Sequence, residues 1–437
     1  MSNNNPPIGV GLLGLGSVGA GVAEALFCHS ERLLSQSGIE FDLKHILVRN
    51  VEKNRPINIP SGVLTQNPDK VLADSEIQII IELIGGIHPA SEYVRQALRS
   101  GKDVITANKD LVAREGPELF ELARKYGRSF RFEAAVCGGM PIIGPITRDL
   151  QANDFRSIHA ILNGTTNFII TSIEEQGTGF DEALDLARTL GYAESDSSND
   201  ISGLDAANKL AIIATLAFRN YVDPADIYCE GIQKLESRDF LYAKELGYGI
   251  KLLAMAEAQE DGILVRVHPS LVPESHLLAK VSGIYNAVQL DGNYSGSIVF
   301  HAQGAGRWPT TSAILGELLD VGKGILTVQA PHLPLPVIER NKTLKNILDL
   351  KTSYYFRMTV SDEAGVFGQI AAVLGSMEIS IASVIQKDAD TEKGTAEIVI
   401  TTHSSREYQI QQSLAILSDL PVVVMVNNVI RIEELSS

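Results

Sequence analysis

A short apolar segment followed by a glycine-rich turn constrains the fold of this chain most strongly. Residues 8–13 are typical of a buried β-strand, and a helix is expected at about 18–34. A GxGxxG pattern between a strand and a helix indicates a dinucleotide-binding fold, because its glycines permit a tight turn and bring the backbone close to a pyrophosphate. The residues expected to contact the cofactor here are Gly14, Leu15, Gly16, Ser17, Val18 and Gly19.

Strands and helices continue to alternate through the first third of the chain. Strands are expected at 42–48, 77–83, 103–107 and 129–133, and helices at 88–100 and 116–126. This order predicts an α/β fold with a doubly wound parallel sheet of the Rossmann type. Arg49, Lys53 and Arg55 follow the second strand, where an acidic residue would bind the ribose 2′-hydroxyl of NAD. We therefore expect NADP, with NAD as the open alternative.

Size and charge exclude several classes of protein. A chain of 437 residues is too long for one core and predicts two or three domains. A net charge of −16 argues against nucleic acid as a partner. No apolar run reaches the roughly 18 residues of a membrane span, and the N-terminus lacks a signal-peptide pattern. The three scattered cysteines fit a reducing compartment, so we expect a cytoplasmic protein without a membrane partner.

An acidic loop leads into a helix that carries a lysine on its apolar side. At about 100° per residue, Lys209 projects into the apolar arc of Leu210 and Ile213. A lysine in such a place is either paired or has a lowered pKa, and lowered pKa values are common at sites that move protons. The alternative is an ordinary surface ion pair with Asp205. The acidic loop favours the functional interpretation. Its carboxylates are Glu194, Asp196, Asp200 and Asp205.

Three further polar clusters are candidate site segments. Residues 106–109, Thr-Ala-Asn-Lys, follow a predicted parallel strand at the carboxyl edge, where ligands of open α/β sheets bind. Residues 133–141 form a glycine turn whose Glu133 and backbone carbonyls could hold a monovalent cation, although a domain-crossing turn explains them equally well. Residues 162–167, Leu-Asn-Gly-Thr-Thr-Asn, are expected to form a loop that presents hydroxyls and N–H groups to a small polar ligand.

These segments together resemble the homoserine dehydrogenase family with a C-terminal ACT domain. The family's signature is matched by Ala187, Gly191, Asp196, Asp200, Gly203, Asp205 and Lys209. The segments TANK at 106–109, NGTTN at 163–167 and GAG at 304–306 also match, so the resemblance spans nearly the whole chain. Ser197 replaces the usual proline of the acidic loop, and Cys137 stands where glycine or alanine is expected.

The resemblance implies a role for each matching residue. Lys109 and Lys209 would flank the reacting oxygen as catalytic residues, with Asp205 orienting Lys209. The substrate would be bound by Gly164, Thr165, Glu194, Asp200 and Asp205. Outside the glycine turn, the cofactor would be bound by Arg49, Lys53, Thr106, Lys109, Gly304 and Gly306. A monovalent cation, Na⁺ or K⁺, would be held by Glu133 and the carbonyls of Val136 and Gly138.

The implied reaction interconverts L-homoserine and L-aspartate 4-semialdehyde with NAD(P), in threonine, methionine and isoleucine biosynthesis. Hydride transfer to the aldehyde carbon leaves negative charge on its oxygen, which a cation able to donate a proton would stabilise. In the oxidative direction the same lysine, when neutral, would accept the hydroxyl proton. Lys209 is the expected acid/base ahead of Lys109, and the acidic loop would bind the ammonium group of the amino acid.

The expected domains follow from these segments. Residues 1–140, completed by a helix at about 307–325, would form the dinucleotide-binding domain. Residues 141–306 would form a substrate and oligomerisation domain with a mostly antiparallel sheet, including strands at 265–268, 287–290 and 297–300. We expect a homodimer or homotetramer.

A proline-rich linker at 330–350 would lead to a module at 351–437 with the order βαββαβ. Its strands are expected at 354–360, 380–387, 395–402 and 422–432, and its helices at 366–376 and 406–417. The turn at 362–365 resembles the glycine turn of ACT domains, with Ala364 in place of the usual proline. The resemblance implies feedback control by an amino-acid effector, with threonine expected. A dimerisation module without a ligand is the alternative.

Three rival functions share parts of this pattern. Phosphoglycerate dehydrogenase also combines a Rossmann domain with an ACT domain, but it uses a His–carboxylate pair and inserts its nucleotide domain into the substrate domain. Aspartate-semialdehyde dehydrogenase needs a cysteine nucleophile, for which Cys137 is the only candidate. A non-catalytic nucleotide sensor predicts that replacing Lys209 leaves function intact.

Overall fold

The computed structural model describes residues 6–327 and 335–435. The chain forms two compact units. Unit 1 consists of Met1–Ile158, Asn208–Asp226 and Val288–Lys342, and unit 2 of His159–Ala207, Ile227–Ala287 and Thr343–Ser437. Among the described helices, none has the length and apolar character needed to cross a membrane.

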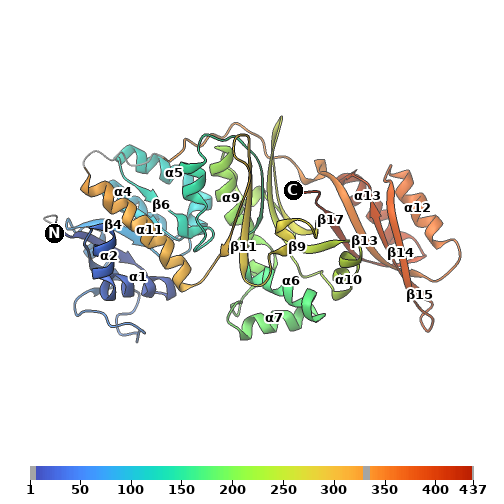
Figure 1. The fold of residues 1–437 in the computed structure, drawn as a ribbon, viewed down its shortest axis with the longest axis horizontal. Helices are drawn as coiled ribbons and strands as arrows, with labels where there is room; N and C mark the ends of the chain where they lie inside the picture. Colours follow the sequence, from blue (N-terminus) through green and yellow to red (C-terminus); the bar gives the residue numbers. More distant parts are fainter. Residues whose placement is uncertain (1–5, 328–334, 436–437) are drawn as a thin grey trace. The chain divides into compact units, whose positions relative to one another are not determined.

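Unit 1 contains a six-stranded parallel sheet (Figure 1). Its strands run in the order β3-β2-β1-β4-β5-β6, so the predicted doubly wound sheet is confirmed. Their bounds are β1 Ile8–Leu13, β2 Phe41–Leu47, β3 Leu64–Thr65, β4 Ile77–Glu82, β5 Asp103–Thr106 and β6 Phe130–Arg131. Every residue of β1 is buried, because this strand pairs with β2 on one side and β4 on the other. The two-residue β3 was not predicted, because it is too short to show a pattern.

Two helices of unit 1 differ from the prediction in extent. The helices of this sheet are α1 Ser17–Cys28, α2 Ser30–Ser37, α3 Asp69–Leu72, α4 Ala90–Arg99, α5 Lys109–Tyr126 and α11 Arg307–Leu326. The helix expected at 18–34 is interrupted at His29, whose backbone leaves the helical region with φ −122° and ψ 17°. The helix expected from 116 begins at Lys109 instead, because Asn108 caps it by accepting a hydrogen bond from the N–H of Leu111.

Helix α11 packs on α1 although it comes much later in the chain (Figure 1). A Cβ placed at Gly21 of α1 would lie 2.3 Å from the hydroxyl oxygen of Thr311, so the two helices approach too closely for a side chain there. Ile314 and Leu318 of α11 share a hydrophobic core with Leu12 of β1. This apolar contact is what brings a late segment back to the first sheet.

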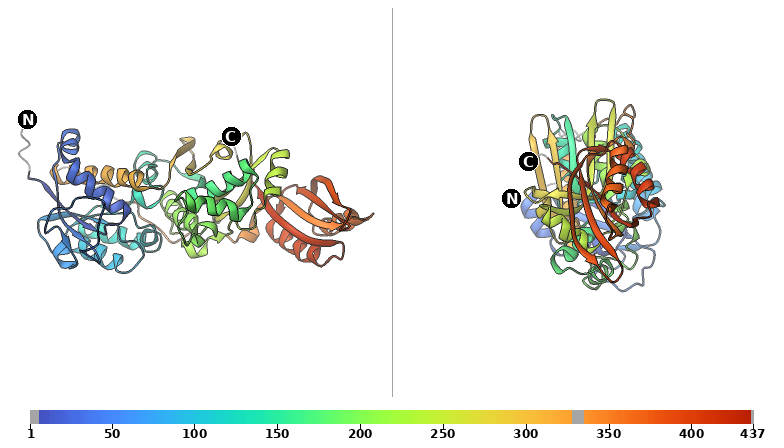
Figure 2. Two further views of the ribbon diagram at one scale, coloured as in Figure 1. Left: turned by 90° about the horizontal axis from the view of Figure 1, so that it is seen from below. Right: turned by 90° about the vertical axis from the view of Figure 1, so that its right-hand side faces the viewer.

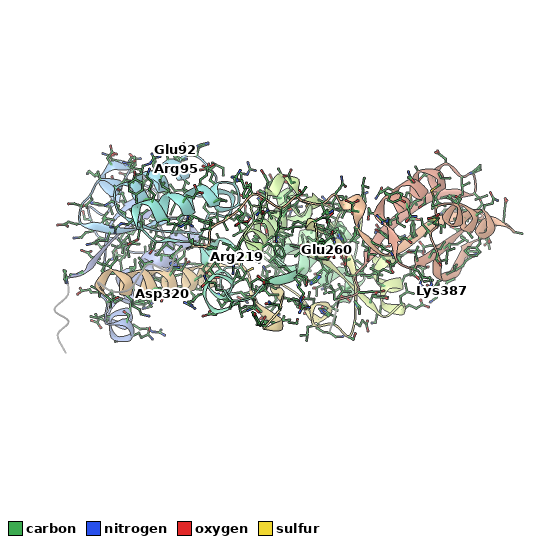
Figure 3. All side chains as sticks on the ribbon, turned by 90° about the horizontal axis from the view of Figure 1, so that it is seen from above. Glu92, Arg95, Arg219, Glu260, Asp320 and Lys387 are labelled. Carbon is green, nitrogen blue, oxygen red and sulfur yellow. The ribbon has the colours of Figure 1, made fainter. Side chains whose placement is uncertain are left out.

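Helices α4 and α5 are joined by an ion-pair network at the surface. Arg95 of α4 donates hydrogen bonds of 2.8 Å to Glu115 and to Glu118 of α5. Figure 3 shows Arg95 beside Glu92 on the outside of the molecule. These ion pairs help to fix the orientation of α5, the helix that begins at Lys109.

The second sheet is mostly antiparallel, as predicted for the substrate region. Its strands run in the order β12-β11-β7-β9-β10-β17-β13-β15-β14, with β8 pairing to β10 and β16 to β13. Those that precede the C-terminal module are β7 Phe155–Ile161, β8 Tyr228–Cys229, β9 Tyr248–Gln259, β10 Gly262–Pro273, β11 Tyr285–Gly292 and β12 Gly296–Gln303. The accompanying helices are α6 Gly164–Gln176, α7 Phe180–Thr189, α8 Ser198–Ile201, α9 Leu204–Phe218 and α10 Ser237–Glu245. Strand β9 was missed because its alanine, leucine and methionine residues favour helices, and burial decides the outcome.

Apart from the additional two-residue strand β16, the C-terminal residues have the expected order βαββαβ. The elements are β13 Lys351–Ser361, α12 Val366–Ser376, β14 Ile381–Asp390, β15 Thr395–Thr402, β16 Ser405–Arg406, α13 Glu407–Asp419 and β17 Val423–Ile432. Figure 2 shows both helices of this module on one face of its strands, where they enclose a core of their own. Strand β17 also pairs in parallel with β10, which joins the module to the substrate sheet.

Part of the expected linker lies outside the described residues, namely 330–334. The segment after it is anchored at two points. Glu339 forms a β-bridge with Asn220, and Leu344 forms one with Ile263.

Candidate active site

The glycine turn between β1 and α1 has the geometry of a dinucleotide-binding loop. Gly14 has a φ of +99°, and a Cβ there would lie 2.7 Å from the carbonyl oxygen of Leu83. A Cβ at Gly19 would lie 2.4 Å from the carbonyl oxygen of Gly14, so the start of α1 packs directly on the turn. Gly16 faces open space, and the first N–H groups of α1, from Ser17 onward, have no helical acceptor. The turn can therefore receive an anion at the helix N-terminus.

The segment after β2 holds the basic residues expected to select the cofactor. Arg49 and Lys53 are exposed. Arg55 donates hydrogen bonds to the carbonyl oxygens of Asn50, Val51 and Lys53, and so closes its own loop. Arg49 and Lys53 are consequently the better candidates for contact with a 2′-phosphate.

The carboxyl edge of the parallel sheet carries a carboxylate that the sequence pattern did not single out. Glu82, the last residue of β4, is fully buried and accepts a hydrogen bond of 2.6 Å from the hydroxyl of Thr106 at the end of β5. The same hydroxyl accepts a hydrogen bond from the backbone N–H of Asn108. The hydroxyl of Thr106 is thus engaged in two hydrogen bonds within the protein. A contact between this residue and a cofactor would therefore have to come from its main chain. A polar residue at the end of an apolar strand was the only signal of Glu82 in the sequence.

The two candidate lysines lie on helices that are bonded to each other within unit 1. Lys109 is the first residue of α5, and Lys209 lies in the first half of α9 with 9% of its surface exposed. The side chain of Asn208 donates a hydrogen bond of 3.1 Å to Asp110. Because these two residues are the chain neighbours of the lysines, their bond brings the two lysine segments together. Asp205 is buried and precedes Lys209 by about one helical turn, so both side chains lie on the same side of α9.

In unit 2, one amide side chain holds two carboxylates of the acidic loop. The Nδ2 of Asn163 donates hydrogen bonds of 2.7 Å to Asp200 and 2.8 Å to Asp205. Its Oδ1 accepts a hydrogen bond from the N–H of Thr166 and caps α6. The prediction of a loop is therefore wrong for residues 164–167, which form the first turn of that helix because Asn163 supplies its cap.

The other predicted substrate residues flank this cluster in the chain. A Cβ at Gly164 would lie 2.8 Å from the carbonyl oxygen of Ile284, so the backbone passes close to a neighbouring loop. The hydroxyl of Thr165 donates a hydrogen bond of 2.6 Å to the carbonyl oxygen of Tyr192. Glu194 is exposed in the segment before α8, where it is accessible to a ligand.

Both departures from the expected family pattern are buried. Ser197 precedes α8, and its carbonyl oxygen accepts hydrogen bonds from the N–H groups of Asp200 and Ile201. The backbone therefore begins the helix there without the help of a proline. Cys137 has no exposed surface, which does not suit a nucleophile that must reach a substrate.

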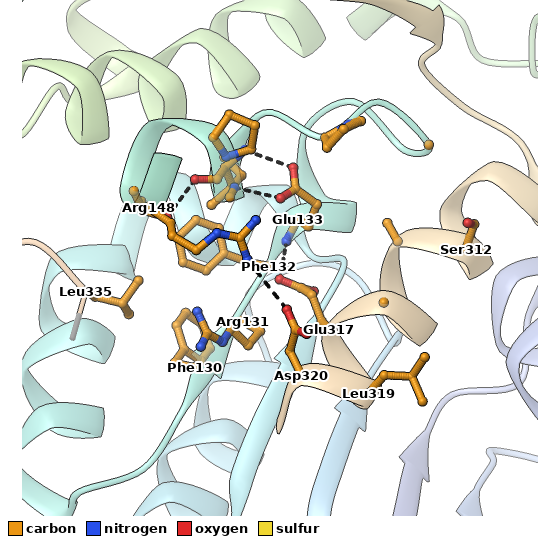
Figure 4. A pocket seen from close by; sticks show the side chains of 18 of the residues that line it. Phe130, Arg131, Phe132, Glu133, Arg148, Ser312, Glu317, Leu319, Asp320 and Leu335 are labelled. Carbon is orange, nitrogen blue, oxygen red and sulfur yellow. Dashed lines mark hydrogen bonds and ion pairs between the residues drawn. The ribbon is translucent and has the colours of Figure 1, made fainter. Parts of the chain in front are cut away.

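The turn after β6 places Glu133 at a cavity of about 540 Å³ (Figure 4). Its carboxylate accepts three backbone hydrogen bonds, from Ile142, Ile143 and Gly144. A carboxylate offers about four acceptor positions, so roughly one is left for a cation. Of the predicted ligands, Glu133 lines this cavity, whereas Val136 and Gly138 are not among its lining residues. A single carboxylate with backbone carbonyls would suit Na⁺ or K⁺ better than a divalent ion, which prefers several carboxylates. Behind it, Glu317 of α11 accepts the backbone N–H of Glu133 at 2.8 Å, and burial raises the pKa of the Glu317 carboxyl to about 8.

The same turn meets the predicted GAG segment. A Cβ at Gly138 would lie 2.7 Å from the carbonyl oxygen of Gly304, so the two backbones are in contact. Gly306 has a φ of +120° and immediately precedes α11. Arg307 at the start of that helix forms an ion pair with Glu24 of α1. The segment is thus held next to the first helix of the dinucleotide-binding fold.

Comparisons with known proteins agree on one family. The family model described as homoserine dehydrogenase matches residues 141–319, and the model described as homoserine dehydrogenase, NAD binding domain, matches residues 14–133. A homoserine dehydrogenase of Neisseria gonorrhoeae is 41% identical over 433 residues, which cover 98% of this chain and 99% of that protein. One of Bacillus subtilis is 38% identical over 427 residues, covering 98% of each chain. The crystal structure of a homoserine dehydrogenase from Thiobacillus denitrificans superposes with a TM-score of 0.91 at 39% identity and covers 99% of both chains.

Proposed function

The chain belongs to the homoserine dehydrogenase family and is an oxidoreductase, and we propose that Lys209 and Lys109 carry its acid/base chemistry. The observation that supports this most directly is α9, where Asp205 and a nearly buried Lys209 share one side of a helix bonded to the start of α5. The comparisons do not favour phosphoglycerate dehydrogenase or aspartate-semialdehyde dehydrogenase. The burial of Cys137 also argues against the latter.

In the reductive direction, Lys209 donates a proton to the carbonyl oxygen of L-aspartate 4-semialdehyde as negative charge develops there. In the oxidative direction, neutral Lys209 accepts the hydroxyl proton of L-homoserine. Lys109 adds positive charge beside the same oxygen, and Asp205 orients Lys209. When bound, the nicotinamide cofactor supplies or accepts the hydride.

The acidic loop binds the ammonium group that every α-amino acid substrate carries. Asp200 and Glu194 supply the negative charge, and Asn163 holds Asp200 in place through its side-chain amide. Gly164 and Thr165 begin the helix that Asn163 caps, so they lie next to these carboxylates in the chain.

The cofactor is NADP in preference to NAD, because the segment after β2 offers exposed Arg49 and Lys53 and no carboxylate at its first position. A monovalent cation at Glu133 steadies the turn that contacts Gly304. We expect this cation to influence activity through the turn and not through contact with the substrate.

The C-terminal module is an ACT domain that senses threonine and inhibits the enzyme. Three contacts within unit 2 offer a route for such control. Arg431 of β17 pairs with Glu230 at 2.9 Å, and the neighbouring N–H of Ile232 donates to the carbonyl oxygen of Ile201 in α8. The thiol of Cys229 likewise donates to the carbonyl oxygen of Ser202. The module is therefore connected to the end of the acidic loop by a chain of direct contacts.

The first experiment is the absorbance of reduced nicotinamide when the purified protein meets L-homoserine, with NAD and NADP in parallel and with Na⁺ or K⁺ at alkaline pH. A rise with either cofactor establishes the reaction, and the ratio of rates tests the preference for NADP. No rise with either would defeat the proposal. Adding threonine then tests the sensor. An unchanged rate would favour the alternative of a dimerisation module without a ligand, and sedimentation would measure the oligomeric state.

A further inference from the structure

The buried carboxylate of Glu82 accepts hydrogen bonds from neutral donors. Its Oε1 accepts the backbone N–H of Ile84 at 2.7 Å and that of Gly85 at 3.3 Å, and its Oε2 accepts the hydroxyl of Thr106. Burial raises the pKa of this carboxyl, while the hydrogen bonds act in the opposite direction. Keeping a charged carboxylate in such a place costs stability unless its hydrogen bonds replace the lost contacts with water.

On one side, Glu82 fixes the loop that lies against the glycine turn. The N–H groups of Ile84 and Gly85 both point to its Oε1. The preceding carbonyl, that of Leu83, is the one that leaves no room for a Cβ at Gly14. The loop that borders the dinucleotide turn is therefore attached to this carboxylate.

On the other side, Glu82 is the end of a hydrogen-bond chain that leads to the start of α5. The hydroxyl of Thr106 donates to Glu82 and accepts the N–H of Asn108. The side chain of Asn108 donates to the carbonyl oxygen of Gly86 at 2.6 Å and caps α5 through the N–H of Leu111. Lys109 is the next residue in the chain, so its backbone position depends on this arrangement.

We propose that Glu82 is a positioning residue that holds Lys109 in its place, through Thr106 and Asn108, at the edge of the sheet where the cofactor binds. This inference rests on the proposed function, because it assumes that Lys109 acts in catalysis. It adds to that function a residue that touches neither substrate nor cofactor.

Two substitutions separate the two sides of the carboxylate. Glu82→Gln keeps an acceptor oxygen for Ile84 and Gly85 but turns an amide N–H₂ toward Thr106, so the hydroxyl loses its acceptor. Thr106→Val removes the hydroxyl and keeps the volume of the side chain. Both should lower kcat on the order of tenfold or more, because a small displacement of a catalytic group is costly. The KM for L-homoserine and the Kd for the cofactor should stay within about threefold of wild type, because the loop beside the glycine turn keeps its bonds.

Matched variants control for a merely structural effect. Glu76→Gln makes the same change just before β4, at an exposed residue, and should leave kcat unchanged. Thr106→Ser keeps the hydroxyl and should lose less activity than Thr106→Val. Melting temperatures of all variants show whether the fold is intact.

The decisive measurement combines Glu82→Gln with Lys109→Ala. If Glu82 acts through Lys109, the double variant should have the kcat of Lys109→Ala alone. A full additional loss in the double variant would overturn the inference, as would a wild-type kcat for Glu82→Gln or a Kd that weakens as much as kcat falls. A wild-type kcat for Lys109→Ala would instead defeat the proposed role of Lys109, and with it any role of Glu82 through that residue.

Discussion

The side chains of Asn208 and Asp110 share a hydrogen bond of 3.1 Å that joins the helix of one candidate lysine to the helix of the other. Asn208→Ala removes the donor, so we expect kcat with L-homoserine to fall on the order of tenfold through misplacement of Lys209. The free energy of unfolding should fall by about 1 kcal/mol, the usual contribution of one such hydrogen bond. Asp110→Asn keeps an acceptor oxygen and should lose less. Steady-state kinetics and thermal melting test both variants, and a wild-type kcat for Asn208→Ala would contradict the expectation.

Replacing Lys209 should separate catalysis from cofactor binding. Lys209→Met keeps most of the side-chain volume on the apolar side of α9 and removes the proton donor. We expect kcat to fall by roughly 10² to 10⁴, the usual contribution of an acid/base group, while the Kd for the cofactor stays near wild type. Lys244→Met in α10, where the lysine is exposed, is the matched control. Wild-type turnover in Lys209→Met would mean that this lysine is not the acid/base.

The amide of Asn163 should be needed for substrate binding and for stability. Asn163→Asp keeps a good helix cap but replaces the two donated hydrogen bonds by repulsion from Asp200 and Asp205. We expect a higher KM for L-homoserine and a loss of about 1–3 kcal/mol in the free energy of unfolding, as for a buried group left unsatisfied. Kinetics and urea unfolding measure the two effects. An unchanged KM for L-homoserine would show that Asp200 and Asp205 do not bind the substrate.

The choice of cofactor should depend on Arg49. Arg49→Ala removes a positive charge from the end of β2, so we expect the KM for NADP to rise while the KM for NAD changes little. Arg55→Ala is the informative comparison, because Arg55 holds its own loop and its loss should affect both cofactors alike. An equal change for both cofactors in Arg49→Ala would place specificity elsewhere.

The buried His268 should make the fold sensitive to mild acid. Burial and the nearby Arg431 and Arg266 lower the pKa of His268 well below its usual value, although Glu433 faces its Nε2 at 3.8 Å. Below pH of about 6.5 the unfolded chain takes up a proton that the folded chain refuses, so stability falls as the pH falls, by at most about 1.4 kcal/mol per unit.

Urea midpoints at about pH 7.5 and pH 5.5 measure this effect. His268→Gln should lose less stability on acidification than wild type, whatever its stability at neutral pH. His29→Gln, at an exposed position, should follow wild type. Equal slopes for His268→Gln and wild type would show that His268 is not the group responsible.

The local sequence pattern predicted secondary structure correctly where residues close together in the chain determine it. The strand at 8–13 and the glycine turn after it were predicted correctly, as were the helix at 366–376 and the strand at 395–402. In these segments hydrophobic periodicity and turn residues indicate the same structure. Where they conflict, as in β9, the alanines and leucines favour a helix but burial between neighbouring strands makes a β-strand.

The family, the parallel sheet with its dinucleotide turn, and the two candidate lysines could all be predicted from the sequence, because each depends on motifs of residues close together in the chain. The helix starts at Asn108 and Asn163 were not predicted although they are local, because each side chain caps an N–H group three residues later in the chain. Tertiary packing places Glu82 behind Thr106, 24 residues away, and Asp110 beside Asn208, 98 residues away. Hydrogen bonds between such distant residues depend on how strands and helices pack, and no local pattern of hydrophobicity or charge contains that information.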